Sequence, residues 1–126
     1  MRIGILETGE VSPELRKIHG SYGDMFQNLI SEIYRSSSFK TINIIEGQFP
    51  KNQLDADLWL ITGSKYGVYD SLSWINPLKN FILGCVGKNV PVFGVCFGHQ
   101  ILAEALGGKV KQFQGGWGLG VHKYEI

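Results

Sequence analysis

The seven residues Gly94-Val95-Cys96-Phe97-Gly98-His99-Gln100 decide the fold of this chain, because they place a cysteine midway between two glycines. The apolar stretch Val90 to Val95 leads into the cysteine and predicts a strand. Gly98 to Leu106 predicts a helix, and Gly107-Gly108 is typical of a helix end. A strand, a sharp turn with a nucleophile at its apex and a helix together make a nucleophile elbow.

The elbow gives Cys96 a chemical role that an ordinary buried cysteine lacks. The turn would project its sulfur from the sheet, and the N-terminus of the following helix would favour the thiolate. The backbone N–H of Phe97 would then be placed to bind a developing oxyanion. The competing interpretation, a small buried hydrophobe, is the commoner fate of cysteine and suits Cys85, on the apolar face of a predicted helix. For Cys96, the flanking strand and helix favour catalysis.

Apolar runs and turn residues predict alternating strands and helices along the rest of the chain. A loop rich in Gly, Ser and Pro follows the first strand. Strands that are apolar on both faces and alternate with helices predict an α/β fold, a mostly parallel sheet with helices on both faces. The predicted strands are 2–6, 40–45, 58–61 and 90–95, with further strands at Val110 and Val121–Ile126, and the predicted helices are 22–35, capped by Ser21, and one that Ser73 caps and that runs through Cys85.

A second turn, Ile61-Thr62-Gly63-Ser64, follows the buried strand 58–61. In parallel α/β sheets the active site lies at the carboxyl ends of the strands, which is where this turn and the elbow both belong. The backbone N–H groups of Gly63 or Ser64 could supply a second oxyanion donor. An ordinary tight turn explains the spacing equally well, so both interpretations remain open here.

The three histidines do not supply a convincing general base. His99 follows the elbow, but it falls in the first helical turn, and we expect it to point into the fold in a structural role. His19 lies in the glycine-rich loop and His122 in a terminal strand. None has the spacing of a metal ligand set, and no metal is expected. A cysteine enzyme normally needs a base, so the residues alone leave the catalytic machinery incomplete.

Composition restricts the broad class of the protein. The chain has 126 residues, of which 44% are hydrophobic and 18% charged, with a formal net charge of +1, which suits one domain with a real core. Its Lys and Arg residues are scattered, so no nucleic-acid partner is expected. No apolar run is long enough for a membrane span, and the first residues do not resemble a signal peptide. We expect a cytoplasmic location, where both cysteines stay reduced.

The stretch PVFGVCFGHQILAEALGGK, which ends at Lys109, closely resembles the nucleophile segment of class I, triad-type glutamine amidotransferases. Its GxCxGHQ core is more specific than the elbow alone. Three further stretches are similar to the stand-alone group called GMP synthase-like glutamine amidotransferases, and together they extend the resemblance over essentially all of residues 1–126: LITGSKYGVYDSLSWINPL from Leu60 to Leu78, ILETGE…HGSYGDMF near the start, and GGWGLGVHKYEI at the end.

The resemblance implies a flavodoxin-like class I amidotransferase fold and a known chemistry without a cofactor. By position, Cys96 would attack the side-chain amide of glutamine, form a γ-glutamyl thioester and release ammonia. The Phe97 backbone and the Gly63–Ser64 turn would form the oxyanion hole, and Gln100 would line the glutamine pocket. His99 does not match the family's catalytic base.

One departure from the family is large. The family's catalytic His and Glu, and the segment that grips the α-amino and α-carboxylate groups of the substrate, come after the GWG region and lie beyond Ile126. We therefore expect a partial, C-terminally truncated domain over residues 1–126, inactive or nearly so by itself. The substrate would be glutamine or another γ-glutamyl small molecule, and the synthetase that would accept the ammonia is unknown.

Three alternatives remain. A γ-glutamyl peptidase would use the same thioester chemistry, and only the shape of its pocket would differ. An inactive fragment could act as a binding or assembly partner through exposed apolar sheet edges. Cysteine domains of the intracellular protease and deglycase type share the elbow, but they usually carry histidine directly after the cysteine, where this chain has Phe97.

Overall fold

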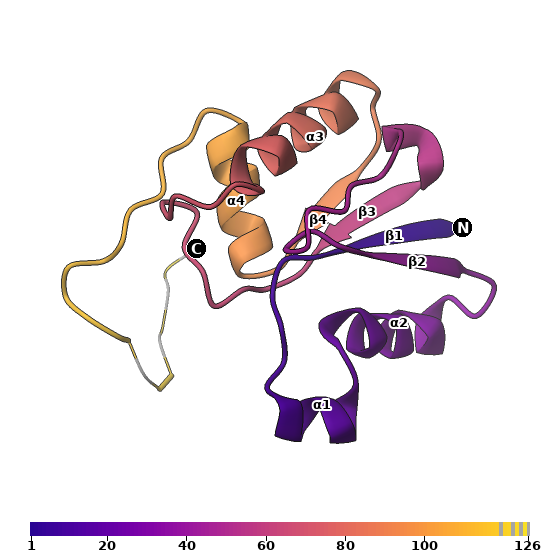
Figure 1. The fold of residues 1–126 in the computed structure, drawn as a ribbon, viewed down its shortest axis with the longest axis horizontal. Helices are drawn as coiled ribbons and strands as arrows, with labels where there is room; N and C mark the ends of the chain where they lie inside the picture. The colour runs from indigo at the N-terminus through magenta and orange to yellow at the C-terminus, as the bar shows by residue number, and fades with distance from the viewer. Residues whose placement is uncertain (119, 122, 124, 126) are drawn as a thin grey trace.

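A four-stranded parallel sheet forms the centre of the molecule (Figure 1). The computed structural model describes residues 1–118, 120, 121, 123 and 125. The strands are β1 (Arg2–Glu7), β2 (Ser38–Asn43), β3 (Leu58–Ile61) and β4 (Val92–Gly94), in the spatial order β2-β1-β3-β4. The expected parallel α/β sheet is confirmed, and the strand predicted over 90–95 is shorter than expected.

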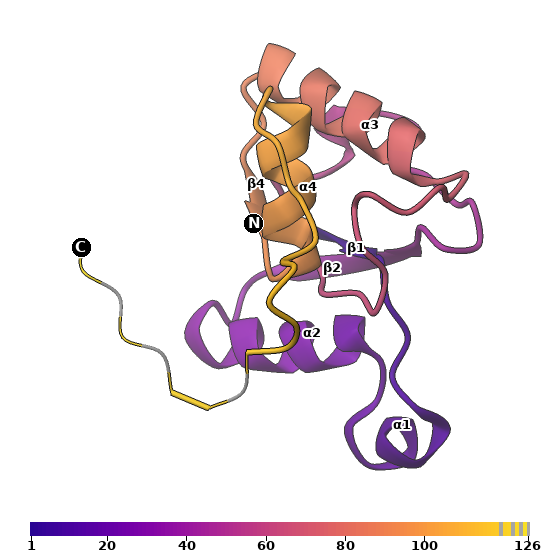
Figure 2. The ribbon, with the colours of Figure 1, turned by 90° about the vertical axis from the view of Figure 1, so that its left-hand side faces the viewer.

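Helices cover both faces of the sheet, as the turned view in Figure 2 shows. Helix α2 (Tyr22–Ile33) lies on one face, and helices α3 (Ile75–Gly87) and α4 (Phe97–Ala105) lie on the other. The larger apolar cluster joins the sheet to α3 and α4, with Trp59 and Phe81 packed edge to face at 5.1 Å between ring centroids. The smaller cluster joins Ile3, Ile5 and Leu60 to the inner side of α2. Among the residues that the structure describes, no helix combines the length and apolarity needed to cross a membrane.

The region between β1 and α2 contains a helix, α1 (Pro13–His19), where we predicted only a loop. Pro13 stands at the first turn, where its missing N–H costs nothing, and Gly20 ends the helix with a φ of 76°. None of its residues is buried, so it has no apolar periodicity. A search for apolar residues at helical spacing misses such a helix, because the residues that indicate it lie at its ends, Pro13 at its start and Gly20 after its end. His19 is therefore the last residue of a helix.

The predicted start of α2 is confirmed and the predicted start of α3 is wrong. Ser21 and Asp24 form a capping box, in which the Ser21 hydroxyl accepts from the Asp24 N–H at 3.2 Å and the Asp24 carboxylate accepts from the Ser21 N–H at 2.8 Å. Helix α3 instead begins after Trp74, and no side chain caps it. Ser73 lies one residue too early, in the turn that precedes the helix, and the N-cap position is taken by the buried Trp74.

The chain after α4 does not form the strand predicted at Val110. Gly107 and Gly108 end the helix as expected, with the Gly108 N–H donating to the Ala103 carbonyl at 2.8 Å. Val110 then packs against the core from an irregular segment, and its N–H donates to a Glu104 oxygen at 3.4 Å rather than to a strand. Of the strand predicted over 121–126, residues 122, 124 and 126 lie outside the described residues, and 121, 123 and 125 are not in a strand.

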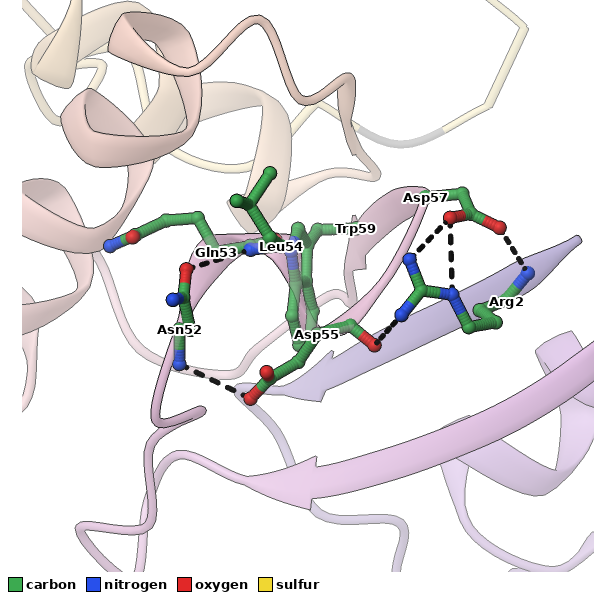
Figure 3. A network of polar contacts seen from close by, with 7 residues as sticks. All are labelled: Arg2, Asn52, Gln53, Leu54, Asp55, Asp57 and Trp59. Atoms are coloured by element: carbon green, nitrogen blue, oxygen red, sulfur yellow. Dashed lines mark hydrogen bonds and ion pairs between the residues drawn. The ribbon is translucent and has the colours of Figure 1, made fainter.

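The amino edge of the sheet is held by a polar network (Figure 3). The Arg2 guanidinium donates to one Asp57 oxygen at 2.6 and 3.1 Å, and the Arg2 backbone N–H donates to the other at 2.8 Å. These bonds hold the pKa of Asp57 below its usual range. The 3-10 turn η1 (Gln53–Asp55) lies beside them, and its Gln53 carbonyl accepts from the Trp59 indole at 2.7 Å. The network fixes the start of β3 against β1 at the edge opposite the elbow.

We predict that Glu104→Gln lowers the free energy of unfolding by about 1 kcal/mol at neutral pH. Glu104 of α4 pairs with Lys79 of α3, and the Lys79 hydrogen bond lowers the pKa of this carboxyl. The folded pKa is depressed, so the stabilisation is present above the unfolded pKa and is lost as pH falls through the folded value. Urea unfolding at neutral pH and at about pH 3 measures this. Glu32→Gln, at an exposed site on α2, is the matched control. A difference from wild type that persists in acid would contradict the assignment.

Candidate active site

Cys96 occupies a strained bend between β4 and α4. Its backbone has φ 54° and ψ −107°, a conformation that only glycine adopts easily. Holding a cysteine there costs about 1–3 kcal/mol, and such strain persists only where the surrounding structure enforces it. The side chain is exposed, whereas Cys85 is buried in the core. The local geometry is that of the predicted nucleophile elbow.

The two glycines of the motif are required by close backbone contacts. A Cβ on Gly98 would lie 2.3 Å from the carbonyl oxygen of Ile61, at the end of β3. A Cβ on Gly94 would lie 2.3 Å from the carbonyl carbon of Gly98. Both contacts are with backbone that cannot rotate away, so a larger residue at either position would push α4 off the sheet. This explains the spacing of two residues on each side of Cys96.

The turn after β3 lies beside the cysteine. A Cβ built on Gly63 would be 3.8 Å from the Cβ of Cys96, so the Gly63–Ser64 turn and the elbow meet at the carboxyl edge of the sheet. The hydrogen bonds among the described residues do not use the N–H of Gly63, Ser64 or Phe97 as a donor. The two turns that carry the proposed oxyanion donors therefore lie side by side. Within the described residues, none of these three N–H groups has a protein acceptor.

The first turn of α4 is anchored by aromatic packing. Phe97 is only 1% exposed, and its ring lies 5.5 Å from Trp74, which in turn lies 6.1 Å from Tyr66. The side chain next to Cys96 therefore points into the core while Cys96 points outward. Trp74 and Tyr66 belong to the segment between β3 and α3, so this packing also ties that segment to the elbow.

The prediction that His99 points into the fold is wrong, because its side chain is exposed. His99 is the third residue of α4, and Phe97 and Ile101 occupy the face of this helix that packs against the core. His99 therefore faces solvent, which the motif alone does not reveal. Gln100 is partly buried on the same helix. His122 lies outside the described residues. Within the described part of the chain, no group of three or more His, Cys, Asp or Glu is arranged to hold a metal ion.

Sequence comparison identifies the family. The family model for class I glutamine amidotransferases matches residues 21–124. The chain belongs to this family. It is 35% identical over 133 aligned positions to a putative glutamine amidotransferase of Saccharomyces cerevisiae, covering 91% of this chain and 53% of that protein. It is 30% identical to gamma-glutamyl peptidase 4 of Arabidopsis thaliana over 103 positions, covering 80% of this chain and 40% of that protein.

Solved structures agree on the fold of this amidotransferase-family chain. A crystal structure of a glutamine amidotransferase from Thermotoga maritima superposes with a TM-score of 0.65 at 23% identity, covering 85% of this chain and 43% of that one. One from Methylobacillus flagellatus gives 0.62 at 23% identity, covering 85% and 38%. The chain thus spans about half the length, or somewhat less, of these four proteins.

We predict that Gly98→Ala destabilises the fold by about 2 kcal/mol or more, because its Cβ would overlap the Ile61 carbonyl. The matched control is Gly87→Ala at the end of α3, where an added Cβ meets nothing within 4 Å. There alanine should be neutral or stabilising by about 0.5 kcal/mol, as its helix propensity suggests. Urea unfolding of both variants measures the difference. Equal stabilities would refute the close approach of α4 to β3.

We predict that iodoacetamide at neutral pH alkylates Cys96 and leaves Cys85 unmodified in the folded chain. Burial raises the pKa of the Cys85 thiol to about 11, so it is neutral as well as inaccessible, whereas Cys96 is exposed. Peptide mapping by mass spectrometry identifies the labelled residue, and unfolding in urea should make both reactive. Cys85→Ala is the control and should label as wild type does. Preferential labelling of Cys85 would contradict the structure.

Proposed function

We propose that Cys96 is the nucleophile of a glutamine amide-hydrolysing reaction. Its sulfur attacks the side-chain carbonyl carbon of glutamine, and the tetrahedral intermediate carries its negative charge on the former carbonyl oxygen. The C–N bond then breaks, ammonia leaves with the proton that the Cys96 thiol gave up, and a γ-glutamyl thioester remains on Cys96. Water hydrolyses the thioester to glutamate and frees the thiol.

One observation carries this proposal. A non-glycine residue is held at positive φ, with its side chain exposed, beside three backbone N–H groups that the described hydrogen bonds leave unused. Outward exposure gives the sulfur access to a substrate, and the N–H groups of Gly63, Ser64 and Phe97 would bind the developing oxyanion. Loss of one such donor typically lowers a rate by about 100- to 1000-fold. Gln100, partly buried on α4, would line the pocket for the glutamine side chain.

Hydrolysis of γ-glutamyl peptides is the second candidate reaction. The relative from Arabidopsis thaliana named gamma-glutamyl peptidase 4 supports it. Both reactions pass through the same thioester and differ only in the leaving group. The match to a GMP synthase of Azoarcus, 42% over 52 residues but only 9% of that protein, supports the further suggestion that a synthetase accepts the ammonia.

A binding or assembly role is the third candidate, and an apolar groove supports it. The groove has a volume of about 440 Å³ and lies on the α2 face of the sheet, between Phe26 and Ile30 of α2, Leu60 of β3 and Phe93 of β4. Phe93 is 59% exposed on an edge strand. A stable dimer in size-exclusion chromatography that Phe93→Ser abolishes would favour this role, and a monomer would argue against it.

We predict a Cys96-dependent burst of p-nitrophenolate when the chain meets the γ-p-nitrophenyl ester of glutamic acid. This leaving group departs without being protonated, so the assay reports formation of the thioester and needs no general acid. Cys96→Ala measures spontaneous release, and Cys85→Ala should behave as wild type. Mass spectrometry should find one γ-glutamyl group on Cys96. A burst of equal size in Cys96→Ala would disprove the nucleophile.

The choice between the two reactions needs a separate comparison. Release of glutamate from glutamine and from a γ-glutamyl dipeptide, measured side by side, ranks the two leaving groups. Faster release from the dipeptide would favour the peptidase, and faster release from glutamine would favour the amidotransferase reaction.

A further inference from the structure

We propose that Thr8 and Thr62 are positioning residues that aim the backbone N–H groups of Gly63 and Ser64 at Cys96. The inference rests on the function proposed above and adds to it the device that orients the oxyanion hole. Thr8 follows β1 and Thr62 follows β3, and both side chains are 0% exposed. They are the two buried polar residues of the described core.

The two threonines form a closed hydrogen-bond network with the turn after β3. The Thr8 hydroxyl donates to the Thr62 carbonyl at 2.8 Å, and the Thr62 hydroxyl donates to the Gly63 carbonyl at 3.1 Å. The Thr62 hydroxyl also accepts from the Thr8 backbone N–H at 3.0 Å. Each hydroxyl thus donates its single proton to a carbonyl of the turn. The Thr8 hydroxyl also makes a second, longer contact with the Gly63 carbonyl oxygen, at 3.4 Å.

Holding these two carbonyls also determines where the following N–H groups point. Every peptide bond in the described part of the chain is trans, and in a trans peptide the C=O and the N–H point in opposite directions. Because the Thr62 carbonyl points to Thr8, the Gly63 N–H points away from Thr8. The Thr62 hydroxyl holds the Gly63 carbonyl on the side of the turn where Thr8 lies. The Ser64 N–H therefore also points away from Thr8.

The order of the strands places Cys96 on that opposite side. Strand β3 lies between β1 and β4, so the turn after β3 has the β1 loop on one side and the elbow on the other. On the β1 side, Gly9 approaches the turn closely, since a Cβ built on Gly9 would lie 2.5 Å from the Gly63 carbonyl oxygen. On the elbow side, the Cβ of Cys96 lies 3.8 Å from a Cβ built on Gly63. Carbonyls held toward β1 therefore leave both N–H groups directed toward the sulfur.

The network explains why hydroxyl groups stand where a packed core would favour methyl groups. Thr→Val keeps the shape of the side chain but removes the donor, and at position 62 it also removes the acceptor of the Thr8 N–H. The carbonyl is then free to turn and to carry its N–H away from the sulfur. Thr→Ser removes the methyl group and keeps the donor. The pair of substitutions at each position separates orientation from packing.

The test uses the p-nitrophenyl ester of the preceding section on the full 126-residue chain. In Thr8→Val and Thr62→Val we expect the Cys96-dependent acylation rate to fall by about 10-fold or more, since an oxyanion donor is misdirected. Alkylation of Cys96 by iodoacetamide forms no oxyanion and should keep its wild-type rate. Thr8→Ser and Thr62→Ser should recover most of the acylation rate. Equal acylation in wild type and both valine variants would overturn the proposal.

Two controls separate orientation from a general loss of stability. Ile3→Val removes a buried methylene on β1 at the α2 face of the sheet, and Thr41→Val makes the same chemical change at an exposed site on β2. Both should acylate at the wild-type rate. If Ile3→Val, at an equal loss of stability, slows acylation as much as the threonine variants do, the effect is not positional and the proposal fails.

A direct structural readout separates this proposal from the function on which it rests. Nuclear Overhauser contacts between the Ser64 amide proton and the Cys96 β protons should be present in wild type and in both serine variants and absent in Thr62→Val. A wild-type chain without Cys96-dependent acylation would refute the proposed function. Persistence of the contact in Thr62→Val would refute the positioning role, whatever the chain does to the ester.

Discussion

The approach of the α4 backbone to the end of β3 is the contact on which the rest of the site depends. Gly98 lies so close to the Ile61 carbonyl that no side chain fits between them, and Gly94 lies equally close to Gly98. The chain can make this approach only by bending sharply at Cys96, which accepts an unfavourable φ of 54°. The strain and the exposure of the sulfur therefore have one cause. A relaxed bend would move α4 from the sheet and take the sulfur away from Gly63.

The remaining structure keeps the three loops at the carboxyl edge in register. Parallel pairing of β1, β3 and β4 brings the segments after Glu7, Ile61 and Gly94 to the same edge. Buried polar bonds of Thr8 and Thr62 join the first two segments, and aromatic packing of Phe97 on Trp74 joins the segment after β3 to the elbow. At the opposite edge, the Arg2–Asp57 pair is exposed and contributes little energy, but it ties the start of β3 to β1.

The family and the fold give this geometry its chemical meaning. Class I glutamine amidotransferases provide the expectation of a γ-glutamyl thioester, and the similarity to a plant gamma-glutamyl peptidase keeps a second leaving group open. An exposed sulfur beside N–H groups that the described hydrogen bonds leave unused would suit either reaction as proposed, because both share the attack and the oxyanion. The elbow therefore does not distinguish the two reactions.

The sequence by itself predicted the four strands of the sheet, the elbow and the place of Cys96 at its apex, because these depend on local patterns: apolar runs, glycine spacing and the Ser21 cap. The same reasoning also predicted a strand at Val110 that the structure does not form. Prediction from the sequence also failed where an element shows no apolar periodicity and where the outcome depends on contacts with distant residues. Helix α1 buries nothing, so periodicity could not find it. Helix α3 begins after Trp74 without a side-chain cap, so Ser73 was a misleading signal. The outward direction of His99 depends on which side of α4 meets the sheet. The tertiary structure alone decided that Thr8 and Thr62, 54 positions apart, share one buried network. Only the folded sheet brings them together, and a single sequence carries no signal for a contact between distant polar residues.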